Sequence, residues 1–500
     1  MTRNLEYDDI QLLVRFAHGH LRAARFFFLR AEGKRAECKG WLSELAGEIA
    51  AAPEDTTRPE QAIQLAVAAG GLRALGLSEE VMGTFLQEFR DGMGDPERAR
   101  ALGDVYDSAP DHWDFGGREP AKQIHLALML YAQDRAALER LAGLHRQRFA
   151  SAGLVVVWEQ DTWLDAEGRE PFGFIDGISQ PRVEGLAPPA AQEAVGDPLL
   201  KAGEFILGYE NAYDVLPFSP HLPERLDPSG LLQPVDGLPG FKDLGRNGTY
   251  LVIRKLEQDV AAFKDFLCAK AVDPTTGQPD PTRADWLAAK LMGRWPKSGA
   301  PVTGAPDQDD SALGQDSHKT NAFDYSADQD GFGCPIGAHI RRANPRRPLA
   351  ALHRIIRRGR AYTEQRATGP GGNQEPAQGF MFLAMNANIA RQFEFIQQTW
   401  LNNPGFGGLQ ESRDPIAGAN YQPCGKEPAS AFSAVVPAKP FRIHLTDVPR
   451  LARTRGGDYF FLPGRNALRF LATSAYETPE GESASARASV TYQGMSIAEN

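Results

Sequence analysis

The sequence predicts a mixed α+β fold, because segments with helical and strand-like hydrophobic patterns alternate along its 500 residues. Apolar residues recur at helical spacing near residues 8–30, 60–90, 120–148, 257–270, 284–293 and 387–401. Short runs rich in β-branched and aromatic residues occur at Leu154–Trp158, Glu204–Tyr209, Thr249–Lys255 and Phe380–Met385. The last two of these runs, at 249–255 and 380–385, lead directly into helical patterns, which indicates strand-loop-helix units.

A stretch dense in proline and glycine, Pro217–Gly248, divides these patterns into two groups. Such residues favour turns and irregular backbone. We therefore expect two domains, residues 1–240 and 241–500. A second irregular stretch, Lys297–Asp330, carries several aspartates without the regular spacing of a calcium loop, which favours a solvent-exposed loop.

The composition narrows the class of partner and the compartment. A net charge of −10 disfavours a nucleic-acid binder, because phosphate binding needs a basic surface. The four cysteines, Cys38, Cys268, Cys334 and Cys424, lie too far apart for a CxxC metal site or covalent haem attachment, and they favour a reducing compartment. The N-terminus lacks the basic start and apolar core of a secretory signal, and no apolar run approaches the roughly 18 residues of a membrane span. We expect a cytoplasmic protein with small-molecule partners, and neither nucleic acid nor membrane as a partner.

Asp176 is an acid in an unusual setting, the apolar and glycine-rich segment PFGFIDGISQP at 171–181. Gly173 and Gly177 on either side indicate a tight turn or the close approach of a flat ligand, with Asp176 facing an apolar space. The alternative is an aspartate that makes an Asx turn or a helix cap, and this segment alone favours that alternative.

His339 follows small and apolar residues and precedes four arginines, at positions 341, 342, 346 and 347. Arginine forks suit carboxylates, so these residues could pair with haem propionates beside an axial imidazole. The alternative is a packed core histidine next to a solvated basic surface. The segment by itself leaves both interpretations open.

Arg357 follows the pair Ile355-Ile356, which is typical of a buried strand or helix edge. Such an element would carry its guanidinium from the core to the rim of a cavity, where it needs an anion or dipole to face. The alternative is a basic surface strand. The neighbouring His353 has no predicted role.

The three segments together resemble the dye-decolorizing peroxidase family, in its long bacterial and fungal branch. GFIDG at 173–177 is similar to the family's GxxDG signature, CPIGAHIRRANPR at 334–346 to its axial-histidine segment, and IIRRG at 355–359 to its distal-arginine segment. The separation of 357 − 339 = 18 residues between histidine and arginine is also found in many members. Further similarity extends from YDDIQ near the N-terminus to RGGDYFFLPGRNALRFLA at 455–472.

The resemblance implies two ferredoxin-like halves, each an antiparallel sheet flanked by helices, of the dimeric α+β barrel superfamily type. It implies one non-covalent haem b per chain in the C-terminal half, with His339 as the axial ligand of the iron. Arg342 and Arg346 match residues that contact the haem propionates. Main-chain groups from Ile178 to Gln180 are expected to border the haem edge, and an oligomer is compatible with the resemblance.

The implied activity is that of a haem peroxidase, which reduces hydrogen peroxide through an oxyferryl intermediate and oxidises dyes, phenols or other organic donors. Asp176 would transfer the peroxide proton, and Arg357 would stabilise the negative charge that develops. His339 needs an acceptor for its second N–H group, and we predict Glu394, which lies in an otherwise apolar helical segment. The alternative function is a haem-binding or haem-iron-releasing protein on the same fold with little peroxidase role.

Overall fold

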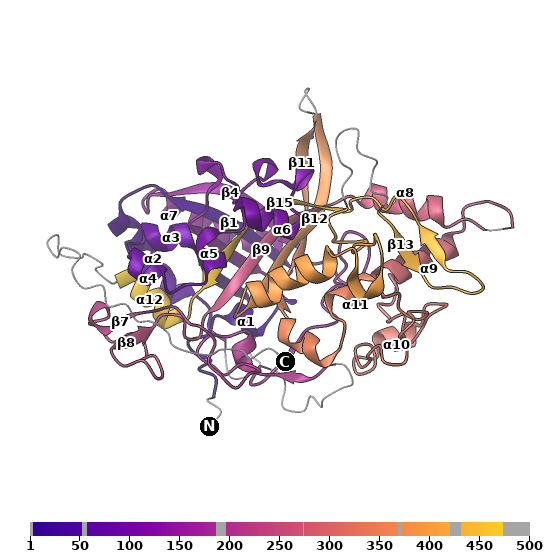
Figure 1. Ribbon diagram of the computed structural model, residues 1–500. Helices are drawn as coiled ribbons and strands as arrows, with labels where there is room; N and C mark the ends of the chain where they lie inside the picture. Colours follow the sequence, from indigo (N-terminus) through magenta and orange to yellow (C-terminus); the bar gives the residue numbers. More distant parts are fainter. Residues whose placement is uncertain are drawn as a thin grey trace.

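A closed antiparallel sheet forms the centre of the protein. The computed structural model describes residues 4–52, 58–186, 197–273, 275–368, 373–420 and 432–473. The strands of the sheet are β1 (Ala23–Ala31), β2 (Gln61–Ala68), β3 (Leu126–Ala132), β4 (Leu154–Trp163), β9 (Thr249–Gln258), β10 (Ile356–Arg357), β11 (Arg360–Thr368), β12 (Asn373–Asn386) and β15 (Ala452–Leu462). Their order is β10-β12-β11-β4-β1-β3-β2-β15-β9, and an additional pairing of β12 with β9 closes the sheet into a barrel (Figure 1). The predicted mixed α+β fold is confirmed.

The barrel consists of two sets of four strands with the same order. In the N-terminal set, β4-β1-β3-β2, helix α2 (Arg35–Glu48) follows β1 and α7 (Arg135–Phe149) follows β3. In the C-terminal set, β15-β9-β12-β11, helix α8 (Val260–Lys270) follows β9, and the π-helical turns η7 (Ala390–Glu394) and η8 (Ile396–Leu401) follow β12. Two short seams join the sets, β15 to β2 at Phe460–Phe461 and β11 to β4 at Ala361. The domain division near residue 240 stays a prediction.

Strand β1 shows how the barrel core is built. Phe27 and Leu29 pack with residues of α2, α7 and α12 (Arg465–Thr473), whereas Phe26 and Phe28 pack on the opposite face with residues of β3, β9 and β15. All four side chains are fully buried. Because both faces of the strand are covered, its apolar residues run continuously instead of alternating. The predicted helix over 8–30 is therefore wrong: only the short helix α1 (Leu12–Arg15) forms there.

The same effect explains why two further predicted helical segments contain strands. Strands β2 and β3 lie within predicted helical segments, and only the remainder of each segment is helical, as α3 (Ala69–Ala74), α4 (Glu79–Met82), α5 (Gln87–Asp91) and α7. The helices predicted at 257–270, 284–293 and 387–401 are confirmed as α8, α9 (Pro281–Met292) and η7–η8. The strands predicted at 154–158, 249–255 and 380–385 are confirmed, but 204–209 is not a strand, because it continues from the short helix η4 (Ala202–Glu204) into a turn at Gly208 with φ of 89°.

The irregular segments cover the barrel and extend it on one side. Residues 217–248 contain the short pair β7 (His221–Pro223) and β8 (Phe241–Asp243) and the single-turn helix η5 (Glu224–Leu226). Helices α9, α10 (Ser311–Gln315) and α11 (His339–Ala343) and strand β13 (Ala434–Val436), which pairs with β14 (Ile443–Leu445), lie away from α2 and α7 (Figure 1). In the described ranges no helix combines the length and apolar character needed to cross a membrane. Cys38, Cys268 and Cys334 are free thiols, and Cys424 lies outside the described residues.

Candidate active site

A cavity of about 290 Å³ lies between the barrel strands β9 and β12 and the helices α9 and α11. Its wall combines apolar side chains, such as Phe174 and Phe382, with the polar side chains of His339, Asp176 and Arg357. His339, Asp176 and Arg357 come from three separate segments of the sequence, each of which contains a candidate site residue. The structure thus brings them to one cavity, as the interpretation of a shared cofactor site requires.

Asp176 lies on a loop that follows β4 and folds back on itself. The backbone N–H of Asp176 donates to Gly168 O at 3.0 Å, and an antiparallel bridge joins Arg169 to Ile175. Gly173 and Gly177 have φ values of 100° and 83°, which L side chains rarely adopt. The two glycines therefore allow the reversal that brings the Asp176 carboxylate to the cavity wall, as the glycine pattern indicates.

Arg357 belongs to β10, and this strand carries the guanidinium to the cavity. Its Nη1 donates to Asp176 Oδ1 at 2.8 Å, and its Nη2 donates to Ser179 O at 3.2 Å. The backbone N–H of Arg357 donates to Gln180 Oε1 at 3.0 Å. Gln180 therefore ties the loop of Asp176 to β10, whereas Ile178 forms part of the cavity wall. The predicted contacts of Ile178 and Gln180 with haem stay predictions.

His339 begins helix α11 and is held by a buried carboxylate. Its Nδ1 lies 3.0 Å from Asp414 Oδ2, and its side chain is 25% exposed, whereas that of Asp414 is completely buried. Burial alone would lower the pKa of His339, but the charge and the hydrogen bond of Asp414 raise it above the usual value. Burial would likewise raise the pKa of Asp414, but His339 keeps it below the usual value. Because Nδ1 faces the carboxylate, Nε2 is the nitrogen that can bind a metal ion.

The prediction that Glu394 accepts the hydrogen bond of His339 is wrong. Arg98 Nη1 donates to both oxygens of Glu394, at 2.9 and 3.0 Å, and the Tyr459 hydroxyl donates to Oε1 at 2.7 Å. These contacts satisfy a carboxylate that would be costly to leave unpaired in its apolar segment. Glu394 does have the partners that its apolar surroundings require, and they are Arg98 and Tyr459.

Asp414 is the functional residue that the sequence interpretation missed. It lies in the loop after η8, and its Oδ1 also accepts the backbone N–H groups of Ile416 and Ala417, at 2.9 and 2.8 Å. It lies 75 residues from His339 in the chain. A single aspartate before proline in a polar loop has no local pattern that distinguishes it from a turn residue.

The predicted contact of Arg342 with a haem propionate is also wrong. Arg342 is fully buried, and its guanidinium donates to four backbone carbonyls, those of Gly337, Trp400, Asn403 and Ser412. It does not line the cavity. Its position three residues after His339 turns it toward the loop that carries Asp414, so Arg342 supports the histidine side of the site through the backbone.

The cavity wall is rich in other arginines. Arg294, Arg346, Arg354 and Arg357 line the cavity, and the predicted contact of Arg346 with a haem propionate stays a prediction. Arg346 donates to Asn321 O and Phe323 O, at 2.8 and 2.9 Å. Burial lowers the pKa of Arg294 and Arg354 to about 10 and also lowers that of Arg346. Desolvated guanidinium groups of this kind favour a ligand that carries carboxylates.

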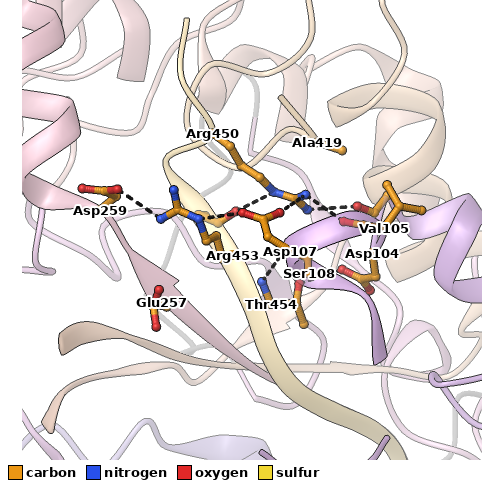
Figure 2. Close-up of polar contacts among 12 residues, drawn as sticks. Asp104, Val105, Asp107, Ser108, Glu257, Asp259, Ala419, Arg450, Arg453 and Thr454 are labelled. Atoms are coloured by element: carbon orange, nitrogen blue, oxygen red, sulfur yellow. Dashed lines mark hydrogen bonds and ion pairs between the residues drawn. The ribbon is translucent and has the colours of Figure 1, made fainter. Parts of the chain in front are cut away.

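Ion pairs hold the end of the cavity nearest to β15. Arg254 donates to Asp104 at 2.6 and 2.9 Å, and both residues line the cavity. Figure 2 shows the adjoining network, in which Arg450 and Arg453 contact Asp107 at 2.9 and 2.7 Å and Arg453 also contacts Asp259 at 3.1 Å. This network joins the loop after α6 (Pro96–Leu102) to β15 and to Asp259, the N-cap residue of α8. It fixes the wall with contacts between segments far apart in the sequence.

Known proteins share the sequence pattern and the fold of this chain. No family model matches the chain. The dye-decolorizing peroxidase of Exidia glandulosa is 32% identical over 489 residues, which span 93% of this chain and 87% of that protein. The crystal structure of a fungal DyP-type peroxidase from Auricularia auricula-judae has a TM-score of 0.73 at 25% identity, covering 94% of this chain and 100% of that chain. A dye-decolorizing peroxidase in complex with 2,6-dimethoxyphenol has the same TM-score, identity and coverage. The chain therefore belongs to the dye-decolorizing peroxidase family.

Proposed function

We propose that this peroxidase holds one non-covalent haem b in the cavity, where His339 would bind the iron. The observation that carries the proposal is that His339 and the pair Asp176–Arg357 line one cavity. Asp414 fits the role of the carboxylate that keeps Nε2 of His339 available and makes the ring more basic. Within the described ranges the cavity wall contains no cysteine, which supports non-covalent binding.

Arg346 is our candidate for binding the haem propionates, together with Arg294 and Arg354. All three line the cavity, and burial withdraws each guanidinium from water. A dianionic ligand would compensate these charges through planar, bidentate contacts. Ile178 would then border the haem edge, next to Asp176.

Asp176 and Arg357 would activate hydrogen peroxide. When bound, the haem supplies the iron centre that exchanges electrons with the peroxide and with the organic donor. Asp176 accepts the proton from one peroxide oxygen and returns it to the other, which leaves as water. Arg357, 2.8 Å from Asp176 Oδ1, orients this carboxylate and stabilises the negative charge that develops as the O–O bond breaks.

We also propose that the two four-stranded sets are ferredoxin-like halves within residues 1–240 and 241–500, with the haem in the C-terminal half. The repeated strand order and the helices after the first and third strands of each set support this assignment. His339, Arg357 and Asp414 belong to the second half, and Asp176 reaches the cavity from the first. The cytoplasmic location, the absence of a membrane partner and the compatibility with an oligomer stay predictions.

The organic donor is proposed to be a phenol or a dye. A related peroxidase has been solved with 2,6-dimethoxyphenol, and this supports a phenolic donor for this chain. The pair Asp176–Arg357 favours catalysis over a protein that only binds haem or releases its iron, because storage requires neither side chain at the cavity.

The test is a visible spectrum and a peroxide assay on the wild type and two variants, all purified with haem supplied. We expect a Soret band and peroxide-dependent oxidation of 2,6-dimethoxyphenol for the wild type. His339→Ala should lose or weaken the haem band, and the exposed control His444→Ala should keep both properties. A wild type that purifies without pigment would overturn the haem site. Pigment without donor oxidation would favour the haem-binding alternative.

A further inference from the structure

The loop that presents Asp176 contains a second carboxylate, Glu170, which has no part in the proposed function so far. Glu170 lines the same cavity. Its Oε1 accepts a hydrogen bond from the backbone N–H of Phe174 at 2.9 Å. Its Oε2 accepts one from the backbone N–H of Phe172 at 3.0 Å and one from the side-chain amide Nε2 of Gln258 at 2.7 Å. We propose that Glu170 is a positioning residue that holds the Asp176 loop in the conformation needed for peroxide activation. This inference rests on the proposed function.

The backbone of the loop explains why a carboxylate is required at this place. Gly173 N donates to Glu170 O at 2.8 Å and closes the turn, while Glu170 N donates to Phe174 O at 2.9 Å. The Glu170 carbonyl is therefore used by Gly173, and the N–H group of Phe174 takes its acceptor from the Glu170 side chain. A buried N–H group left without an acceptor would be costly. The side chain thus completes the hydrogen bonding of the turn.

The turn is anchored to the rest of the protein on both sides. The rings of Phe172 and Phe174 pack on Phe263 of α8, with centroids 5.0 and 6.3 Å apart. The Arg169 guanidinium donates to Gly173 O at 2.8 Å and to Pro296 O at 2.7 Å. Because Asp176 follows Phe174 by only two residues, a shift of the turn moves the Asp176 carboxylate relative to Arg357.

The contacts of Glu170 favour a positioning role over direct proton transfer. Three N–H donors take three of the roughly four lone-pair sites of its carboxylate, so Glu170 is engaged mainly with the turn and with Gln258, whereas a general base needs lone pairs directed toward the peroxide. Gln258 at the end of β9 also fixes the carboxylate to the barrel. Burial raises the pKa of Glu170, and the negative charge of Asp176 adds to that effect, while the three hydrogen bonds oppose it. The titratable groups that interact electrostatically with Glu170 are Asp176, which it positions, and His339 across the cavity wall.

The test compares Glu170→Gln, Asp176→Asn and the double variant, with the exposed Glu80→Gln as a charge-matched control. The glutamine NH2 group must face at least one of the three N–H donors, so the turn loses acceptors without losing volume. We expect the rate of reaction with peroxide to fall roughly 10- to 100-fold in Glu170→Gln, as for a small displacement of a catalytic group. Cyanide association should slow in parallel, because it needs the same proton acceptor but no donor oxidation.

The double variant separates a positioning role from an independent one. If Glu170 acts through Asp176, the double variant reacts as slowly as Asp176→Asn alone. The proposal would be overturned if the rate loss in the double variant equalled the product of the losses in the two single variants. It would also be overturned if Glu170→Gln reacted with peroxide at the wild-type rate. If Glu170→Gln folds poorly, Gln258→Met replaces it in the test, because this variant removes only one of the three donors to Glu170. We expect its reaction with peroxide to be several-fold slower than that of the wild type, and an unchanged rate would overturn the proposal.

Amide exchange tests the same role without peroxide turnover. Residues 168–180 should exchange faster in Glu170→Gln than in the wild type, and Glu80→Gln should leave this segment unchanged; equal exchange in both variants would overturn the proposal. Amide exchange does not depend on peroxide chemistry, so it tests the role of Glu170 separately from the proposed function. A wild-type protein that does not react with peroxide would overturn the proposed function, but it would leave the exchange result for Glu170 unaffected.

Discussion

Replacing Asp414 by asparagine should weaken haem binding while the chain stays folded. The asparagine oxygen can still accept the N–H groups of Ile416 and Ala417, which Asp414 Oδ1 binds at 2.9 and 2.8 Å. The NH2 group then replaces Oδ2, 3.0 Å from His339 Nδ1, so that two donors face each other. The imidazole can relieve this contact by moving its hydrogen to Nε2, the nitrogen proposed to bind iron.

The size of the effect follows from the hydrogen bond that is lost. A hydrogen bond to a charged group contributes about 1.5–3 kcal/mol, and each 1.4 kcal/mol or so changes an equilibrium constant about tenfold. Asp414 is completely buried, so water cannot replace the missing acceptor. We therefore expect haem affinity to fall roughly 10- to 100-fold, which agrees with the effect of removing the carboxylate partner of other metal-binding histidines.

The assay is a titration of the haem-free protein with haem, followed through the Soret band, together with circular dichroism as a check of folding. Glu394→Gln is the control, because it removes the same charge from a side chain that contacts Arg98 and Tyr459 instead of His339. Wild-type haem affinity in Asp414→Asn would show that Asp414 does not control metal binding by His339. An equal loss in Glu394→Gln would show that the effect is not specific to the histidine contact.

Three further predictions concern the same structure. Asp176→Asn should keep the haem spectrum but slow the reaction with peroxide by about 10²- to 10⁴-fold, the usual contribution of a general acid–base group; stopped-flow mixing at wild-type speed would contradict this. Arg346→Gln should lower haem affinity, whereas Arg342→Gln should cause the larger fall in the free energy of unfolding, because Arg342 donates to four backbone carbonyls and Arg346 to two; haem titrations and urea unfolding of both variants distinguish the two roles. Burial raises the pKa of Asp458 to about 6, so the stability of the protein should fall as pH rises from about 4 through 6. Asp458→Asn keeps the Oδ1 acceptor for Met93 N and Tyr459 N, and it should raise the free energy of unfolding by roughly 1–3 kcal/mol at pH 8 but not at pH 4; urea unfolding without a gain at pH 8 would contradict it.

The residues that the sequence identified at the cavity are those with a local pattern around them. Asp176 lies between two glycines whose positive φ values allow the chain reversal. Arg357 follows two isoleucines and lies on a strand, and its guanidinium meets Asp176 at 2.8 Å. His339 begins a short helix after a run of small residues. In each case the neighbours determine the backbone, and the backbone determines where the side chain can point.

The residues that were assigned wrongly depend on partners far away in the chain. Glu394 and Asp414 are both acids in segments near η8, but Glu394 contacts Arg98, 296 residues away, and only Asp414 reaches His339. Arg342 and Arg346 are both close to His339 in the sequence, yet one is enclosed by carbonyls and the other lines the cavity. Spacing alone does not distinguish these positions, because packing between elements selects among them.

The sequence alone predicts the α+β class, the strands β9 and β12, the helical segments α8, α9 and η7–η8, and the three segments that meet at the cavity. Only the tertiary structure decided that residues 23–31, 61–68 and 126–132 are strands, because a closed sheet covered by helices buries both faces and removes the alternation that marks a strand. It also decided which carboxylate orients His339 and which arginines surround the cavity. Local pattern reflects the constraint of neighbours on the backbone, whereas hydrogen-bond partners in a buried site are set by the folding of distant segments against one another.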